Sequence, residues 1–434
     1  MRVIVSLTIT AALALTSCTN TSQHGGVSEW ISQSAVPIRA LSTTNDTGSD
    51  IRRAFDLAQV VGLGEATHGQ HESFEIKRSL TMHLIKNHGY RVIAYEASAS
   101  KAAACEAYVS GASDDLDSAM RGFGMLIWSI EENASLLREL REWNQNASPE
   151  QRVRFAGIDV QDAKACGARL AGLLDDRWSS DAAAVRSIYE RLDGTVQKMF
   201  SGDRAAYDDL VRESIELVNR VRSAAAQGRL SQRQLADLRS ALREFEGCTQ
   251  MYLTPGRRDQ SMAEMTLGLL DEPGQNNKIV LWAHNGHVTK SPLRYLGSDE
   301  LAAGGHLAKA LGNKYYAMGF AFGEGDFVAN DLDGDKWIFR TYSIDAPPIG
   351  SLESWFTPIV QEASVIDIQR NSGDPEVEQW KLAGHGQRWF GGYRVPENAR
   401  EITRDASKLM PTYPREAFDA LVFLPRTTAS TPRN

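Results

Sequence analysis

The chain has 434 residues, of which 42% are hydrophobic and 24% are charged, a composition that is ordinary for a globular protein with a sizeable core. Its formal net charge of −8, together with the lack of a long Lys/Arg run, argues against a nucleic-acid-binding protein. Beyond the N-terminus, no stretch of the sequence is long and apolar enough to cross a bilayer.

The N-terminal segment has the pattern of an export signal. Residues 1–17 hold one Arg followed by an apolar run too short for a stable anchor, as in a secretory signal peptide. The run ends in LTSC at residues 15–18, which resembles the bacterial lipobox and predicts lipidation of Cys18. Residues 18–40 predict a flexible tether. We therefore expect an exported lipoprotein, on the periplasmic or cell-surface side, that touches the membrane only through Cys18. The alternative is an ordinary cleaved signal in which Cys18 is incidental.

Six short apolar runs predict buried strands. In chain order they cover residues 60–64, 91–96, 153–159, 278–284, 314–323 and 418–424. Near-continuous hydrophobicity is typical of strands that are covered on both faces. Apolar residues at helical spacing over 72–86 and an Ala- and Leu-rich stretch over 163–174 predict helices between the strands. This alternation predicts an α/β fold with a largely parallel sheet flanked by helices.

The segment from about residue 180 to 250 differs from the rest of the chain. It carries long helical patterns, for example over 182–199 and 232–246, and no strand-like run. We expect a helical insertion or subdomain within one domain that covers residues 41–430. A lid or wall over the sheet is the expected role of these helices, and a separate partner-binding bundle is the alternative.

Apart from Cys18, the sequence holds three widely spaced cysteines, Cys105, Cys166 and Cys248. None of them lies in a C-x-x-C pair, so the spacing does not predict a structural zinc site. One disulfide and buried free thiols are both compatible with this spacing.

Polar residues of catalytic type follow four of the predicted strands. They are Glu65 and His68 after the first strand, Glu96 after the second, Asp159 after the third, and His284 and His287 after the fourth. Ligands of open parallel sheets bind beyond the carboxyl ends of the strands. We therefore expect these side chains to meet in one cleft, with Asp159 at its edge. Taken singly, each has a structural reading as a cap, an ion-pair partner or a buried histidine.

This set of residues suits the direct attack of water on an ester. A histidine with a near-neutral pKa, here His68, can take a proton from water while a neighbouring carboxylate fixes its tautomer. A second histidine or a cation can then stabilise the oxyanion. The G-x-S-x-G elbow of serine hydrolases is absent from the sequence. Nor is the Gly pattern over 62–69 a dinucleotide fingerprint, since the Glu65 carboxylate would repel a pyrophosphate.

Two other functions use the same residues. In the first, Glu65, His68, Glu96, His284 and His287 hold zinc or another divalent ion in a metal-dependent hydrolase of amide or phosphate bonds. In the second, the histidine-rich cleft belongs to a non-enzymatic lipoprotein that holds a metal or haem. Direct catalysis without a metal is the reading we favour, because a His pair three residues apart directly after a strand is a weak metal motif.

Longer motifs, spread from about residue 60 to 428, resemble the erythromycin esterase family. They are GLGEATHGQHE at 62–72, RVIAYEAS at 91–98, FAGIDVQ at 155–161, RRDQSMAE at 257–264, LWAHNGHV at 281–288 and FDALVFLPRTT at 418–428. The resemblance implies an α/β core with added helices and a deep cleft. It also implies hydrolysis of the macrolactone ester of 14-membered macrolides, which inactivates the antibiotic. The expected partner is thus a small-molecule ester or lactone.

The resemblance implies roles for individual residues as well. The histidine that matches His68 activates water without an obligatory metal or other cofactor. Glu65, Glu96, His284 and His287 complete the catalytic set. The residues expected to bind substrate or stabilise charge are Lys77, Arg78, Asp159 and Arg258. Arg258 belongs to the same motif as Asp259 and Glu264, and the role of this motif is expected to be partly structural.

Two features depart from the family pattern. Nine residues beyond the motif histidine, characterised esterases tend to carry Arg, whereas this chain has Lys77 followed by Arg78. Lys keeps the positive charge but lacks the planar fork of a guanidinium. The lipobox-like leader is the second departure, since the resistance esterases of the family are typically cytoplasmic.

Overall fold

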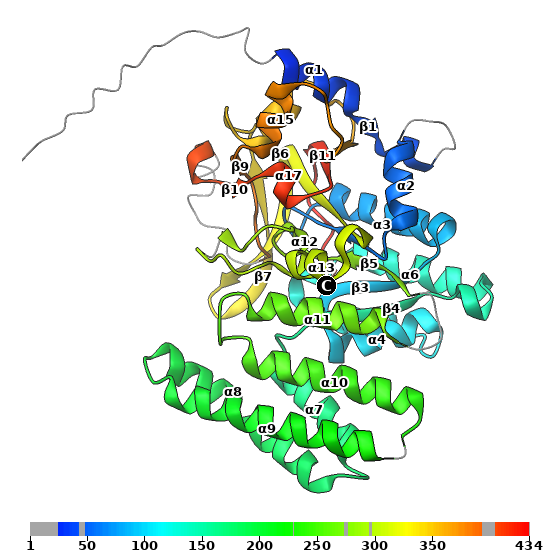
Figure 1. Cartoon of the computed structure of the whole chain (residues 1–434), viewed down its shortest axis with the longest axis vertical. Coiled ribbons are helices and arrows are strands. Elements are labelled where there is room, and N and C mark those ends of the chain that lie inside the picture. The colour runs from blue at the N-terminus through cyan, green and yellow to red at the C-terminus, as the bar shows by residue number, and fades with distance from the viewer. Residues whose placement is uncertain are drawn as a thin grey trace, which may run out of the picture.

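A nine-stranded sheet forms the centre of the molecule (Figure 1). The computed structural model describes residues 25–42, 48–228, 230–272, 277–294, 297–392 and 404–433, so residues 1–17 and Cys18 lie outside the described residues. In order across the sheet, the strands are β1 (Val36–Pro37), β8 (Ser364–Asp367), β11 (Ala420–Thr427), β6 (Tyr315–Asp333), β2 (Val60–Leu63), β5 (Lys278–Trp282), β3 (Tyr90–Ser98) and β4 (Arg154–Asp159), with β7 (Lys336–Ile344) paired to β6.

The prediction of a largely parallel sheet is confirmed. All six predicted runs are strands, and the neighbours β11, β6, β2, β5, β3 and β4 run parallel to one another. Two antiparallel additions were not predicted. Strand β8 lies between β1 and β11, and β6 continues past residue 323 to form a long hairpin with β7.

Helices cover both faces of the sheet, as an α/β fold requires. The longer ones are α1 (Gly25–Ser34), α2 (Ser49–Leu57), α3 (His71–His88), α4 (Ala99–Ser110), α6 (Glu131–Asn146), α7 (Ala163–Leu174), α8 (Ser179–Phe200), α9 (Ala205–Gln227), α10 (Gln232–Gln250), α11 (Arg257–Leu270), α13 (Ala303–Leu311) and α15 (Pro375–Leu382). The shorter ones are α5 (Leu116–Arg121), α12 (Asn285–Val288), α14 (Leu352–Phe356), α17 (Pro414–Ala417) and the 3₁₀ turn η2 (Leu126–Trp128), while β9 (His385–Gln387) and β10 (Met410–Thr412) form a separate small sheet.

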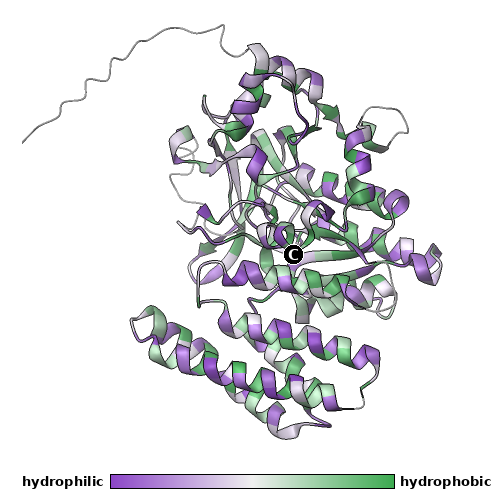
Figure 2. Cartoon of the chain, in the orientation of Figure 1, coloured by the Kyte–Doolittle hydropathy of each residue, from purple (hydrophilic) through white to green (hydrophobic). Residues whose placement is uncertain are grey.

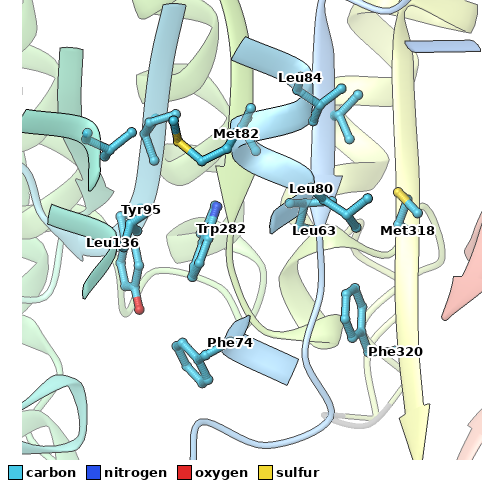
Figure 3. Close-up of a cluster of buried hydrophobic side chains, with 14 of the residues drawn as sticks. Leu63, Phe74, Leu80, Met82, Leu84, Tyr95, Leu136, Trp282, Met318 and Phe320 are labelled. Carbon is cyan, nitrogen blue, oxygen red and sulfur yellow. The ribbon is translucent and has the colours of Figure 1, made fainter. Parts of the chain in front are cut away.

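Alternate residues of each central strand enter two different hydrophobic clusters. Val61 of β2 and Trp282 of β5 face α3, α4 and α6, whereas Val60 and Leu281 face α11 and α13. Figure 3 shows the first cluster, in which Leu80 and Leu84 of α3 lie over the strands. This double cover explains why the strands read as continuous apolar runs in the sequence.

The segment beyond β4 builds the expected helical insertion. Helices α7, α8, α9 and α10 share a hydrophobic cluster of their own and project from the sheet at the lower end of Figure 1. Hydrophilic and hydrophobic residues alternate along these helices, as expected when one side of each packs into a shared core (Figure 2). Cys166 and Cys248 lie in this cluster, and together with Cys105 they are buried free thiols. No helix in the described ranges combines the length and apolar character needed to cross a membrane.

The prediction of a flexible tether over residues 18–40 is wrong for residues 25–40, the part that the structure describes. Residues 25–34 form α1, and Val36–Pro37 pairs with β8. Val27, Trp30 and Ile31 are buried on one side of α1, and the Trp30 ring lies 5.8 Å from that of Trp380 in α15. Burial of this apolar stripe supplies the stabilisation that a polar tether lacks.

Candidate active site

The carboxyl ends of four adjacent strands deliver the predicted polar residues to one place. Strands β2, β5, β3 and β4 are consecutive in the sheet, and the residues that follow or end them are those singled out from the sequence. His68, Glu96, His284 and His287 line a pocket of about 350 Å³, and Glu65 and Asp159 lie behind this lining. Its polar lining is His68, Glu96, Gln161, Arg258, His284 and His287, and its apolar lining is Met125, Ile127, Trp389, Gly391 and Met410. This volume lies within the usual range of small-molecule sites, which is roughly 300–1,000 Å³.

His68 is held as a neutral imidazole with one nitrogen available to the pocket. Its Nδ1 lies 3.1 Å from Glu65 Oε1, and because a carboxylate can only accept, Nδ1 carries the proton. Nε2 therefore bears the lone pair. Burial lowers the pKa of His68 to about 4, so the ring is uncharged at neutral pH. The Trp128 ring packs against the imidazole in a T-shaped arrangement, at a centroid distance of 4.5 Å, and restricts its orientation.

The Glu65 carboxylate is shared between His68 and Lys77. The Lys77 ammonium donates to Glu65 Oε2, and both side chains are 1% exposed. Burial lowers the pKa of Lys77 well below its ordinary value, whereas the Glu65 carboxylate and the face of the Trp282 ring, whose centroid lies 4.6 Å away, favour the charged ammonium. Lys77 thus lies behind His68 and is not among the residues that line the pocket.

Arg258 joins the acidic residues from two strands. Its Nε and Nη2 donate to the two oxygens of Asp159 at 3.0 and 2.9 Å, and Nη2 also donates to Glu96 Oε1 at 3.2 Å. Burial opposes ionisation of the Glu96 carboxylate, yet the positive charges of His287 and Arg258 hold its pKa well below the usual range. Glu96 is therefore ionised, and the guanidinium remains a permanent cation in the pocket lining.

His287 is held between two carboxylates. Its Nδ1 lies 2.8 Å from Asp259 Oδ1, and its Nε2 lies 3.2 Å from Glu96 Oε1 and 3.0 Å from Arg258 Nη1. Burial and the neighbouring Arg258 cation oppose the charged form, but Asp259 and Glu96 outweigh them and raise the pKa of His287 to about 10. The ring is thus an imidazolium at neutral pH, and Asp259 fixes its orientation.

Both ring nitrogens of His284 make hydrogen bonds to the protein backbone. Nδ1 accepts from the backbone N–H of Gly286 at 3.1 Å, and Nε2 lies 3.3 Å from the carbonyl oxygen of Ala66. Burial lowers its pKa to about 3, so the ring is neutral and Nε2–H donates to Ala66. Its backbone N–H donates to Glu96 Oε2 at 2.8 Å. His284 therefore ties the loop after β2 to the loop after β5.

The structure does not bring Arg78 to the pocket. Its guanidinium pairs with Glu75 at 2.6 Å and with Glu139 at 2.5 Å, on the side of α3 that faces α6. Consecutive residues of a helix point about 100° apart, so Arg78 cannot accompany Lys77 inward. The expected role of Arg78 at the site is corrected accordingly, and it forms part of the contact between α3 and α6.

Several lining residues had not been singled out from the sequence. Gln161 follows β4 and donates to Asp159 Oδ2 at 2.8 Å, so its place two residues after the strand is a signal that could have identified it. Met125, Ile127, Trp389 and Met410 come from loops and short elements far from the central motifs. Their sequence context offers no periodicity that could have identified them.

One group of side chains has the composition of a metal site. Ligand atoms of Glu65, His68 and Glu96 all lie within 4.8 Å of one another. However, Glu65 is engaged by Lys77 and His68, and Glu96 by Arg258, His287 and the backbone of His284. An ion would have to displace the Lys77 ammonium and compete with two further cations. The donor set therefore fits a metal poorly.

Gly64 permits the close approach that places the motif after β2. A Cβ atom at this position would lie 2.2 Å from Asn285 Oδ1 and 3.0 Å from the carbonyl oxygen of Met318. We expect Gly64→Ala to lower the free energy of unfolding by about 1–3 kcal/mol, the usual cost of overpacking, as measured by urea denaturation. Gly172→Ala, where nothing lies within 4 Å of the added carbon, is the control and should cause no loss. Equal stability of the two variants would contradict this packing argument.

Comparisons with known proteins agree with this fold. A model of the erythromycin esterase family matches residues 85–427, a range that begins after the His68 motif. An erythromycin esterase type II from Escherichia coli is 23% identical over 362 residues, which are 75% of this chain and 84% of that protein. A crystal structure of a Bacillus cereus protein superposes with a TM-score of 0.74 at 20% identity, covering 95% of this chain and 99% of that one. A mutant of the erythromycin esterase EreC in its open conformation gives 0.67 at 17% identity, covering 91% and 98%.

Proposed function

The chain belongs to the erythromycin esterase family and is a hydrolase, and on this premise we propose that it cleaves a carboxylic ester or lactone with water activated by His68. The observation that carries this proposal is the state of His68. It is a neutral imidazole whose Nδ1 is bound to Glu65 and whose Nε2 is left for the pocket. Among the described residues that line the pocket, none is a Ser or Cys that could act as a nucleophile in its place.

In the proposed reaction, His68 Nε2 accepts a proton from water while the water oxygen attacks the carbonyl carbon of the ester. Glu96 acts as a fixed negative charge that favours the resulting imidazolium, since its charge raises the pKa of His68. The imidazolium then gives its proton to the alcohol oxygen as the carbon–oxygen bond breaks. One carboxylic acid and one alcohol are formed for each water consumed.

The cations of the pocket stabilise the oxyanion that forms during the reaction. Arg258 and His287 both line the pocket and both carry positive charge, so negative charge that develops on the carbonyl oxygen is stabilised there. Their own carboxylate partners, Asp159 and Asp259, hold them in place before substrate arrives. In this proposal His284 positions the two catalytic loops and does not itself exchange protons with the substrate.

For the substrate we propose the macrolactone of a 14-membered macrolide, whose hydrolysis would inactivate the antibiotic. The family membership and the apolar side of the pocket, formed by Met125, Ile127, Trp389 and Met410, support this choice. We also propose that the protein is exported and lipidated at Cys18. That proposal rests on the lipobox-like segment alone, and membrane fractionation of a Cys18→Ala variant tests it.

Mass spectrometry of the products tests the proposed reaction. The purified protein is incubated with 14-membered macrolides and with simpler lactones and esters, before and after treatment with a chelator. We expect a mass gain of one water that persists after chelation. Activity that disappears with the chelator and returns with zinc would favour the metal-dependent alternative. Absence of turnover across the whole panel would overturn ester hydrolysis.

The pH dependence of the reaction follows from the two shifted histidines. Protonation of His68 below its pKa of about 4 removes the base, and deprotonation of His287 above about 10 removes a cation. We therefore expect kcat/KM to be nearly flat from pH 5 to 9 and to fall on either side, as measured with a pH-insensitive ester. An acid limb centred between pH 6 and 7 would contradict the buried, neutral state of His68.

A further inference from the structure

A second hollow adjoins the active-site pocket. It has a volume of about 370 Å³, close to the 350 Å³ of the pocket itself. Met125 is a lining residue of both, so its side chain forms part of their common boundary. Met125 is therefore the residue at which the two hollows meet, and a substrate that occupies both has to pass it.

The segment that carries Met125 is suited to letting a substrate pass. Gly124 has φ +84°, the left-handed conformation that favours glycine, and it begins a short turn that leads into η2. Met125 is only partly buried, and an unbranched thioether side chain adapts easily to a new neighbour. At the far end of η2, Trp128 packs against the His68 ring. The boundary between the hollows is thus three residues from the side chain that orients the base.

The chemistry of the second hollow differs from that of the first. Its lining includes Arg121, Asp117, Ser129 and Arg433. Arg433 donates to Asp117 at 3.3 Å and to Glu131 at 2.5 Å. Arg121, in contrast, makes no ion pair within the part of the chain that the structure describes. The hollow therefore offers guanidinium donors and carboxylate acceptors side by side.

We propose that this second hollow is a subsite for a hydroxyl-bearing part of the substrate, on the far side of Met125 from the reacting ester. Hydroxyl groups both donate and accept hydrogen bonds, so they match Arg121 and Asp117 together. The Asp117 carboxylate would repel a purely anionic group. A purely apolar group would displace water from Arg121 without offering a hydrogen-bond acceptor in its place. Hydrolysis of the ester in the active-site pocket rests on the proposed function. Binding of hydroxyl groups to the subsite does not rest on it.

A non-hydrolysable probe tests binding alone. Hexyl glucoside carries an apolar chain for the active-site pocket and hydroxyls for the subsite, and hexanol lacks the hydroxyls. By calorimetry we expect Arg121→Ala to weaken hexyl glucoside binding about tenfold, the effect of losing one hydrogen bond to a charged group, and to leave hexanol unchanged. Asp117→Asn should weaken it less, since an amide oxygen still accepts. Arg212→Ala, an exposed arginine on α9, is the matched control.

Kinetics give the second readout. With 6-O-hexanoylglucose, Arg121→Ala should raise KM about tenfold and leave kcat unchanged, and with methyl hexanoate it should change neither. If methyl hexanoate is hydrolysed but Arg121→Ala alters neither KM nor binding, the subsite is wrong and the proposed function stands. If neither ester is hydrolysed but hexyl glucoside binding depends on Arg121, the proposed function is wrong and the subsite stands.

Discussion

We expect His68→Asn to lower kcat by about two to four orders of magnitude, the usual contribution of a positioned general base. The asparagine side chain is smaller than imidazole and can still reach Glu65, so the buried carboxylate keeps a donor. What the variant lacks is a nitrogen that can accept a proton from water. KM should change far less than kcat, because the base acts in the transition state.

The control for this variant is a second histidine on the same protein. His306→Asn changes a half-buried residue of α13 that does not line the pocket, and it should leave kcat unchanged. Circular dichroism and urea denaturation show whether both variants fold. A folded His68→Asn protein that retains most of its activity would refute the assignment of His68 as the base.

Replacing Lys77 with Met should have the largest effect on stability. The substitution leaves the Glu65 carboxylate 1% exposed with no positive partner, since His68 is neutral. Breaking one side of a buried ion pair typically costs about 3–5 kcal/mol, because the remaining charge has lost its water and its partner. Such a loss is a large part of the roughly 5–15 kcal/mol that stabilises a domain.

A double-mutant cycle separates the pair from the packing around it. Glu65→Gln removes the charge that Lys77 neutralises, so the combination Glu65→Gln with Lys77→Met should be more stable than Lys77→Met alone. Lys86→Met, an exposed lysine on the same helix, is the matched control and should change stability little. Urea denaturation gives the four free energies. Additive effects of the two substitutions would show that Glu65 and Lys77 are not coupled.

Lys77 also accounts for the departure from the family at this position. A single ammonium between Glu65 and the Trp282 ring satisfies one carboxylate oxygen and leaves the other for His68 Nδ1. A guanidinium there would present a planar fork that can engage both oxygens of one carboxylate. The positive charge behind the base is thus supplied by a single ammonium, which leaves Glu65 Oε1 for His68.

Hydrophobic pattern alone was enough to predict the central sheet. Strands buried on both faces must be apolar throughout, so β2, β3, β4 and β5 stand out in the sequence. The polar residues at the end of each apolar run can then be identified as well. Because parallel strands end at the same edge, the proximity of Glu65, His68, Glu96 and His287 could be predicted as well. The hairpin of β6 and β7 could not, because its exposed residues lack that apolar signature.

Tertiary structure alone decided how these residues are used. Lys77 and Arg78 are adjacent in the sequence, and only the packing of α3 on the sheet decides which one turns toward Glu65 and which pairs with Glu139. Likewise, His68 and His284 are both buried neutral histidines, and only their neighbours leave the Nε2 lone pair of one available while Ala66 occupies the Nε2–H of the other. Residue type sets what a side chain can do, but hydrogen-bond partners from distant segments determine which nitrogen carries the proton.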